Sequence, residues 1–303
     1  MRFLADYIMK GRLQAMTVAA TLALLSLAFA PASIVSSASV ALVTLRRGAR
    51  EGLYVLAFAC LAATILSLLL NIGYQFVLMY GLVLWTPVWL IAIVLREARN
   101  LGFALEIAIS LGLLAVLGFY LYQPQTAQFW GQVLATMIQP ILDANPEAPA
   151  EQIKQSAQLF AHFMTGAIAA GTVYSLTFGL FLGRWWQATL YNPGGFKSEF
   201  LSMRGHRPLA WASVLLLAVA SLGSGALAEF CWNLIVVVVV FYTLVGTAVL
   251  HSAFASMKSG RFTVPLLYIT LAVIPHVMIL MALCGLIDQW LDLRKKFSNP
   301  TAV

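Results

Sequence analysis

Few residues of this chain could do chemistry, and most of them stand alone inside long apolar runs. The acidic and imidazole side chains in such positions are Glu106, His162, His251 and His276, and Glu229 lies at a predicted outer turn. An ionisable group inside a bilayer is costly, so it marks a binding or relay site by default. His276 directly follows Pro275, which leaves a carbonyl of the preceding turn without its helical donor. Transporters bind ligands at kinked, polar positions of this kind.

Each of these residues also has a plainer interpretation. Glu106 stands near the end of its apolar run, where water could solvate it or Arg96 or Arg99 could pair with it. His162 and His251 stand near predicted membrane interfaces, where neutral histidines are common. A hydrogen bond to a neighbouring helix would account for His276.

If the protein binds a ligand, we expect a cavity that opens to the outer side of the membrane. The residues predicted to line it are His162, Glu229, Asn233 and His276.

Motifs for catalysis and metal binding are missing from the sequence. It contains no HExxH, GxSxG or P-loop pattern. The three cysteines, Cys60, Cys231 and Cys284, are far apart and form no CxxC or Cys/His spacing. We therefore predict no catalytic residue, no metal site and no cofactor, and we expect neither enzyme nor ATPase activity from this chain alone.

The elements that must position these residues are apolar helices. The chain has 303 residues, of which 61% are hydrophobic and 10% charged, whereas soluble domains have about 45–50% and about 25%. The sequence predicts an all-α, polytopic transmembrane bundle of eight or nine spans in a single membrane domain over 1–303. The predicted spans are 13–29, 34–45, 53–72, 76–95, 101–122, 157–182, 209–227, 232–255 and 264–286.

Two of these segments are ambiguous. The segment 34–45 is short and rich in serine and alanine, so it is either a tilted span or a re-entrant helix. Pro87 predicts a kink in the segment 76–95.

Basic residues set the orientation. With the N-terminus in the cytoplasm and one crossing per span, 14 of the 18 Lys and Arg residues lie on the cytoplasmic side. This explains the net charge of +7 without a nucleic-acid partner, and it predicts a multi-pass protein of a bacterial inner membrane. Nine crossings would leave Arg294, Lys295 and Lys296 outside. Either the stretch around Pro275 doubles back, or the segment 34–45 does not cross the membrane, or the basic tail is an exception to the positive-inside rule.

Between the first five spans (1–122) and the last four (156–303) lies a polar segment, 123–155, predicted to be a periplasmic loop. Six apolar residues recur in it at helical spacing and predict an amphipathic helix on the membrane surface. They are Phe129, Trp130, Val133, Leu134, Met137 and Ile138.

Two features suggest contacts with partner proteins. Ala15, Ala19 and Ala23 recur every four residues, and small residues at this spacing let helices approach closely. The basic loop 183–207 is cytoplasmic in this orientation and combines cations with interfacial aromatic residues. Its predicted docking residues are Arg184, Trp185, Trp186 and Arg204.

The stretch WWQATLYNPGGF at 185–196, with GLIDQWLDLRK at 285–295, resembles the DUF2232 family of bacterial membrane proteins, and the likeness extends over the whole chain. That family is grouped by distant similarity with the substrate-binding S-components of energy-coupling-factor transporters. The resemblance implies a protein without its own ATPase that binds a small molecule from outside. It also implies coupling to a transmembrane partner through an alanine-spaced first helix, which Ala15, Ala19 and Ala23 match.

Two hypotheses follow. The first is a transporter-like membrane protein that binds or moves a small molecule or lipid. The alternative is a scaffold that does not transport and docks a cytoplasmic or membrane protein partner through its basic aromatic loop.

Overall fold

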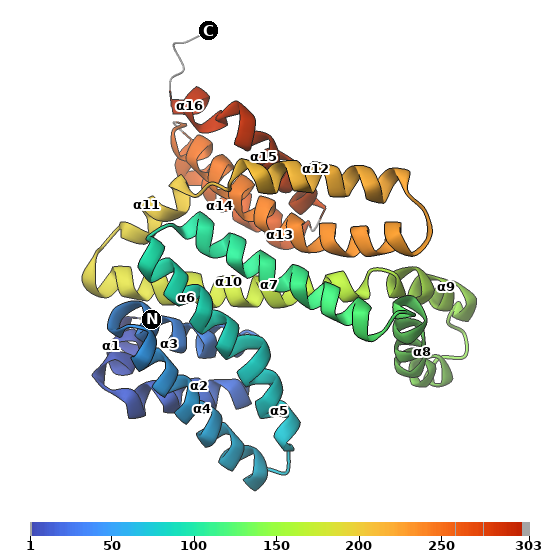
Figure 1. The fold of residues 1–303 in the computed structure, drawn as a ribbon, viewed down its shortest axis with the longest axis horizontal. Coiled ribbons are helices and arrows are strands. Elements are labelled where there is room, and N and C mark those ends of the chain that lie inside the picture. The colour runs from blue at the N-terminus through green and yellow to red at the C-terminus, as the bar shows by residue number, and fades with distance from the viewer. Residues whose placement is uncertain (1, 258, 275, 299–303) are drawn as a thin grey trace.

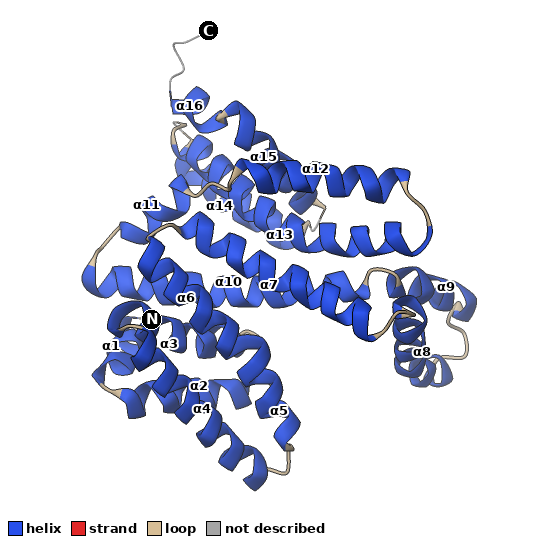
Figure 2. Ribbon diagram, viewed as in Figure 1, coloured by secondary structure: helices blue, strands red, loops and turns tan. Residues whose placement is uncertain are grey.

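The computed structural model describes residues 2–257, 259–274 and 276–298, and every regular element in these residues is a helix (Figures 1 and 2). The elements are α1 (Arg2–Lys10), α2 (Arg12–Leu25), α3 (Ala32–Arg47), α4 (Ala49–Leu69), α5 (Tyr74–Met79), η1 (Tyr80–Trp85), α6 (Thr86–Ala98), α7 (Leu101–Tyr122), α8 (Thr126–Ala144), α9 (Ala150–Ala161), α10 (Met164–Tyr191), α11 (Gly195–Ser202), α12 (Arg207–Leu222), α13 (Gly225–Ala255), α14 (Gly260–Val273), α15 (Val277–Leu291) and α16 (Leu293–Ser298).

Long apolar helices support the prediction of a membrane protein, but eight or nine spans are not confirmed. Within the described residues, five helices are long and apolar enough to cross a bilayer, and a sixth arises if α11 and α12, bent by 50°, form one span. The five are Ala49–Leu69, Tyr74–Ala98, Leu101–Tyr122, Met164–Tyr191 and Gly225–Ala255.

The other three predicted spans are shorter helices. Segment 13–29 becomes α2, whose 14 residues reach about 21 Å, and 34–45 becomes α3, whose 16 residues reach about 24 Å. Both fall short of the roughly 30 Å hydrocarbon core. The last apolar stretch is divided into α14 and α15 at Ile274, which has extended backbone angles. Pro275 and Lys258 lie outside the described residues.

Helix α14 returns along α13, and α15 begins beside the middle of α13. Tyr268 of α14 bonds to His251 of α13 at 2.8 Å, and the Thr243 hydroxyl of α13 lies 3.2 Å from the carbonyl oxygen of Met278 in α15. The two helices therefore form a hairpin whose tip, near residue 276, lies at the level of Thr243. The described parts of the last apolar stretch thus double back, which is one of the three explanations given for the basic tail.

Helix α3 is buried although it is rich in serine. Gly179 and Gly183 of α10 allow a close approach, since a Cβ on either would come within 2.8 Å of a side-chain atom of Ser37 or Ala41. Ser37 donates to the carbonyl oxygen of Ser33 in its own helix, and Ser36 donates to that of Ala19 in α2. Because these hydroxyls have partners, burying them does not leave unsatisfied groups.

Where Pro87 predicted a kink, the structure has a π-helical segment before the proline within one helix, Tyr74–Ala98. Pro87 stands in the first turn of α6, directly after the π-helical residues Tyr80–Trp85, and the three elements α5, η1 and α6 follow without a break. A proline has no N–H to donate to the preceding turn, and a widened π turn is one way a helix accommodates that loss.

Basic residues gather at one end of the bundle, which we call the basic end. There Arg47 donates to the Met9 carbonyl oxygen at 2.5 Å and Arg96 to that of Leu45 at 2.7 Å. Arg204 pairs with Asp292 through a short hydrogen bond. In Figure 1, α1 and α11 lie at this end, and α8 and α9 lie at the other.

A buried ion pair and two hydrogen bonds hold the C-terminal segment, α15 and α16, at the basic end. Arg294 Nε lies 3.5 Å from Asp288 Oδ2, and the side chain of Asp288 is fully buried. Arg294 also donates to the carbonyl oxygens of Leu201 and Met203, both at 2.6 Å. One side chain thus joins α15 and α16 to the loop that precedes α12.

We expect Arg294→Ala to lower the free energy of unfolding by about 3–5 kcal/mol, because it leaves the Asp288 carboxylate buried and unpaired. Thermal unfolding in detergent would measure this. The control is Arg2→Ala, which removes an exposed ion pair with Asp6 and should cost at most about 1 kcal/mol. Equal effects of the two substitutions would contradict a stabilising role for the buried pair.

The Arg204–Asp292 pair predicts a pH dependence. A hydrogen bond from Arg204, and to a smaller extent one from Lys295, lowers the pKa of Asp292 to about 2. A carboxyl group with a lowered pKa stabilises the fold fully above about pH 4 and loses that contribution as the pH falls toward 2. The difference in melting temperature between wild type and Asp292→Asn should therefore be constant from pH 9 to pH 5. Asparagine suits the test because it tolerates the left-handed backbone at this position, where φ is 47°. A difference that shrinks between pH 7 and pH 5 would count against this account.

Candidate functional site

Three of the four predicted ligand-binding residues meet at the end of the bundle opposite the basic end. His162 Nδ1 lies 2.6 Å from Glu229 Oε2. The amide nitrogen of Asn233 lies 2.7 Å from the carbonyl oxygen of His162 and 2.9 Å from the hydroxyl of Tyr120. Tyr120 in turn donates to Glu229 Oε1 at 3.0 Å. We call these four residues the polar network.

The elements that hold the network follow from local sequence. Glu229 and Asn233 are four residues apart on α13 and therefore share one face of that helix. His162 caps the C-terminus of α9, and Tyr120 is near the end of α7. Contacts among these side chains thus connect α7, α9 and α13.

Gly166 brings α10 into the same site. Its backbone N–H donates to Asn233 Oδ1 at 2.6 Å, and a Cβ at this position would lie 2.5 Å from the Asn233 carbonyl oxygen. Asn233 is completely buried, and its side chain has partners for both its oxygen and its nitrogen. Its role within the described residues is therefore to hold α10 against α13.

Sequence reasoning missed both Tyr120 and Gly166 as site residues. A tyrosine near the end of an apolar helix is a signal that could have been used, because a buried phenol hydroxyl needs a hydrogen-bonding partner. No local pattern marks Gly166, whose partner is 67 residues away.

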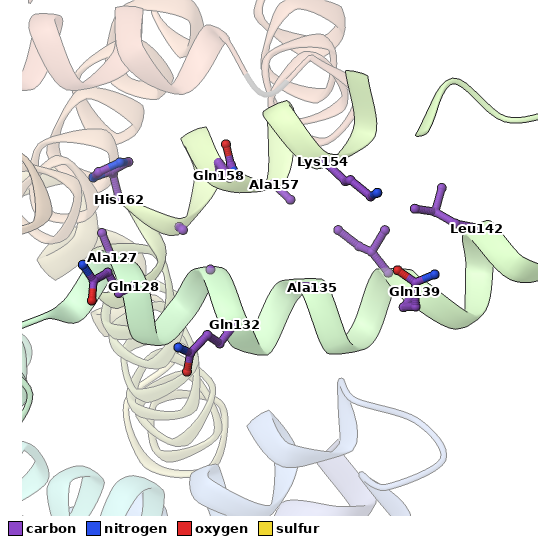
Figure 3. A pocket seen from close by; sticks show the side chains of 13 residues that line it. Ala127, Gln128, Gln132, Ala135, Gln139, Leu142, Lys154, Ala157, Gln158 and His162 are labelled. Carbon is purple, nitrogen blue, oxygen red and sulfur yellow. The ribbon is translucent and has the colours of Figure 1, made fainter. Parts of the chain in front are cut away.

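His162 also borders a cavity of about 590 Å³ between α8 and α9. Its side chain is 51% exposed, whereas that of Glu229 is 19% exposed. In Figure 3, His162 lies near one end of the cavity, and Lys154 and Leu142 lie near the other. The polar lining residues are Gln128, Gln132, Gln139, Lys154, Gln158 and His162.

The lining suits a ligand with both polar and apolar parts. Glutamine amides donate and accept hydrogen bonds, and the Lys154 ammonium donates only. Alanines and Ile138 supply apolar surface between them. A carboxylate oxygen accepts hydrogen bonds, so the contact between His162 Nδ1 and Glu229 Oε2 links a residue of the cavity wall to α13.

Helix α8 occupies the segment where an amphipathic helix was predicted. Trp130 donates to the Thr165 hydroxyl at 2.8 Å and stacks on Phe119 at 5.5 Å, so part of its apolar face packs on α7 and α10. Met137 is 65% exposed. The position of α8 on a membrane surface is not confirmed. Helix α9, which pairs with it, was not predicted.

The remaining predicted residues lie elsewhere. His276 is exposed at the start of α15 and lies near the level of Thr243. Thr243 is about 15 Å along α13 from Asn233, so His276 lies away from the polar network. Glu106 accepts hydrogen bonds from the backbone N–H and the ring of His206, at 2.5 and 2.7 Å. The prediction that Glu106 pairs with Arg96 or Arg99 is therefore wrong, because the loop before α12 folds over it.

The predicted docking residues mostly contact the chain itself. Ala15, Ala19 and Ala23 are completely buried, with α2 packed against α3 and α4. Arg184 forms a two-point ion pair with Glu199, and Trp186 is completely buried. Arg204 bonds to Asp292, while Trp185 is 40% exposed. The geometry thus assigns most of these side chains to internal packing.

No protein family model matches this chain, and comparisons with curated proteins and with solved structures find no similar one. The resemblance to the DUF2232 family stays a prediction.

Two glycines of α10 provide a matched test of the network. Gly166→Ala should lower the free energy of unfolding by about 1–3 kcal/mol, because its Cβ meets the backbone of α13. Gly171→Ala, where nothing lies within 4 Å of the added Cβ, should be neutral or slightly stabilising. Thermal unfolding in detergent compares them, and a neutral Gly166→Ala would refute the close approach.

Proposed function

We propose that this protein is a bacterial inner-membrane protein that binds a small molecule with polar and apolar parts at the cavity between α8 and α9. One observation supports this above all: His162 belongs both to the cavity wall and to the polar network. A ligand group that bonds to His162 acts on Glu229, and through Glu229 and Asn233 on α7, α10 and α13. Ligand binding therefore changes how the long helices are held together.

The proposed topology has six crossings, namely α4, α5 to α6, α7, α10, α12 and α13. The basic end then faces the cytoplasm, in accordance with the positive-inside rule. The N-terminal helix and the Arg294 segment both lie at that end, which supports an even number of crossings. The hairpins α2–α3 and α14–α15 enter from the cytoplasmic side without crossing, and α8 with α9 covers the outer side.

The proposed activity is binding, or movement of the ligand, without hydrolysis of ATP by this chain. The absence of a P-loop from the sequence and the position of the cavity at the proposed outer end support it. A fold similar to transporter S-components remains part of the proposal. With Ala15, Ala19 and Ala23 buried inside the chain, coupling to a partner would use another surface.

Native mass spectrometry of the gently purified protein tests the proposal by detecting a co-purified small molecule. Wild type should carry a bound mass, and Ala157→Trp should lose it, because a tryptophan at this lining position fills the cavity. The matched control is Leu159→Trp, on the same helix, 68% exposed and outside the lining. It should keep the bound mass.

Two results would contradict the proposal. One is a wild-type protein that carries no small molecule when purified from cells grown on complex medium. The other is equal occupancy in Ala157→Trp and Leu159→Trp, which would place the ligand elsewhere.

A further inference from the structure

A second cavity, of about 750 Å³, lies in the other half of the bundle, between α10, α11, α13 and α14. We call it the inner groove. Its walls are mainly aromatic and aliphatic, and include Tyr174, Phe178, Phe181, Leu271 and Met278. Its lysine and histidine side chains, Lys197 of α11 and His251 of α13, line it at the basic end.

In the deep part of the inner groove, the hydroxyl hydrogens of α13 are already donated within the protein. Thr243 and Thr247 line it, but their hydroxyls donate to the carbonyl oxygens of Val239 and Thr243 in the same helix, at 2.8 and 2.7 Å. Apart from these hydroxyls and that of Tyr174, the lining here is apolar, so this part suits a hydrocarbon chain better than a polar molecule.

The length of the groove corresponds to one leaflet of a bilayer. On α10 it extends from Tyr174 to Trp185, eleven residues or about 16 Å. This is about half of the roughly 30 Å hydrocarbon core. Its deep end lies where the α14–α15 hairpin turns, at Met278 and Thr243, and its other end lies at the basic residues.

Helix α14 separates the groove from the membrane on one side. It has one buried residue, Leu267, among the described positions of the helix, and Leu266 and Ile269 are both 59% exposed. The 2.8 Å bond between His251 and Tyr268 fixes α14 to α13, so the groove exists before any ligand enters.

Charge at the mouth selects the headgroup. Lys197 is exposed, and no carboxylate of the described residues lies within ion-pair distance of it. The neighbouring charges Arg184 and Glu199 neutralise each other. Trp185, 40% exposed at the same end, is suited to the headgroup region.

Walls that are mainly aromatic and aliphatic suit a hydrocarbon chain better than ordered water, because each ordered water needs two or more polar partners.

We propose that the inner groove binds one acyl chain of an anionic phospholipid from the leaflet at the basic end, with the headgroup at Lys197. This lipid site is separate from the outer cavity between α8 and α9, and it does not depend on the function proposed for that cavity. The α14–α15 hairpin ends at mid-membrane so that a lipid chain, rather than protein, fills the space beside α10.

Native mass spectrometry of the full-length protein in detergent, with dioleoyl phosphatidylglycerol or dioleoyl phosphatidylcholine added, tests this proposal. Wild type should bind phosphatidylglycerol more tightly than phosphatidylcholine. Lys197→Glu should weaken phosphatidylglycerol binding by about tenfold or more and leave phosphatidylcholine binding nearly unchanged. The control Ser198→Glu adds a negative charge at the next position, outside the lining, and should have a smaller effect.

A second pair of variants tests the groove itself. Ala272→Trp fills its deep part and should abolish the binding of both lipids, whereas Ile269→Trp, on the exposed side of α14, should not. Unfolding curves establish that each variant is folded. If Ala272→Trp does not fold, the test is Lys197→Glu, because its position is exposed. Wild-type lipid binding in a folded Ala272→Trp variant, or equal affinity for the two lipids, would overturn the proposal. A co-purified peptide in place of lipid would also overturn it.

Discussion

The structure depends on the cost of leaving polar groups unpaired in apolar surroundings. In hydrocarbon each unsatisfied backbone or side-chain group costs several kcal/mol. Asn233 illustrates the consequence, since it is completely buried and bonds to groups from α7, α9 and α10. Ser36 of α3 likewise connects helices: its hydroxyl donates to the Ala19 carbonyl oxygen of α2 and accepts from the Trp85 ring N–H at 3.0 Å. These bonds decide which helices are neighbours more specifically than apolar packing can.

Polar contacts also hold the turns of the short helices. Helices α2 and α3 end before they could cross a bilayer, and Ser26 at their turn bonds to the Tyr80 hydroxyl at 2.5 Å, while residues 27–31 of this turn are exposed. The α14–α15 hairpin follows the same plan on the other side of α10 and α13, with Thr243 beside its first turn.

The two ends of the bundle consequently differ. At the basic end, Arg184, Arg204 and Arg294 are used in internal ion pairs that fix the loop before α12 and the C-terminal segment. At the other end, the cavity between α8 and α9 exposes amides and His162. The cavity and the ion pairs that hold the C-terminal segment thus lie at opposite ends of the bundle.

The sequence by itself determined the helical class, the membrane character and the gathering of basic residues, because each follows from composition along the chain. It also selected His162, Glu229 and Asn233, since polar groups in apolar helices are rare enough to be noticed. Tertiary structure alone decided that these three meet, that Tyr120 and Gly166 join them, and that His276 does not. It also decided which apolar runs are full-length helices. Hydropathy is a sum over neighbours in the chain, whereas the depth of a helix and the partner of a side chain depend on residues such as Gly166 and Asn233, 67 positions apart.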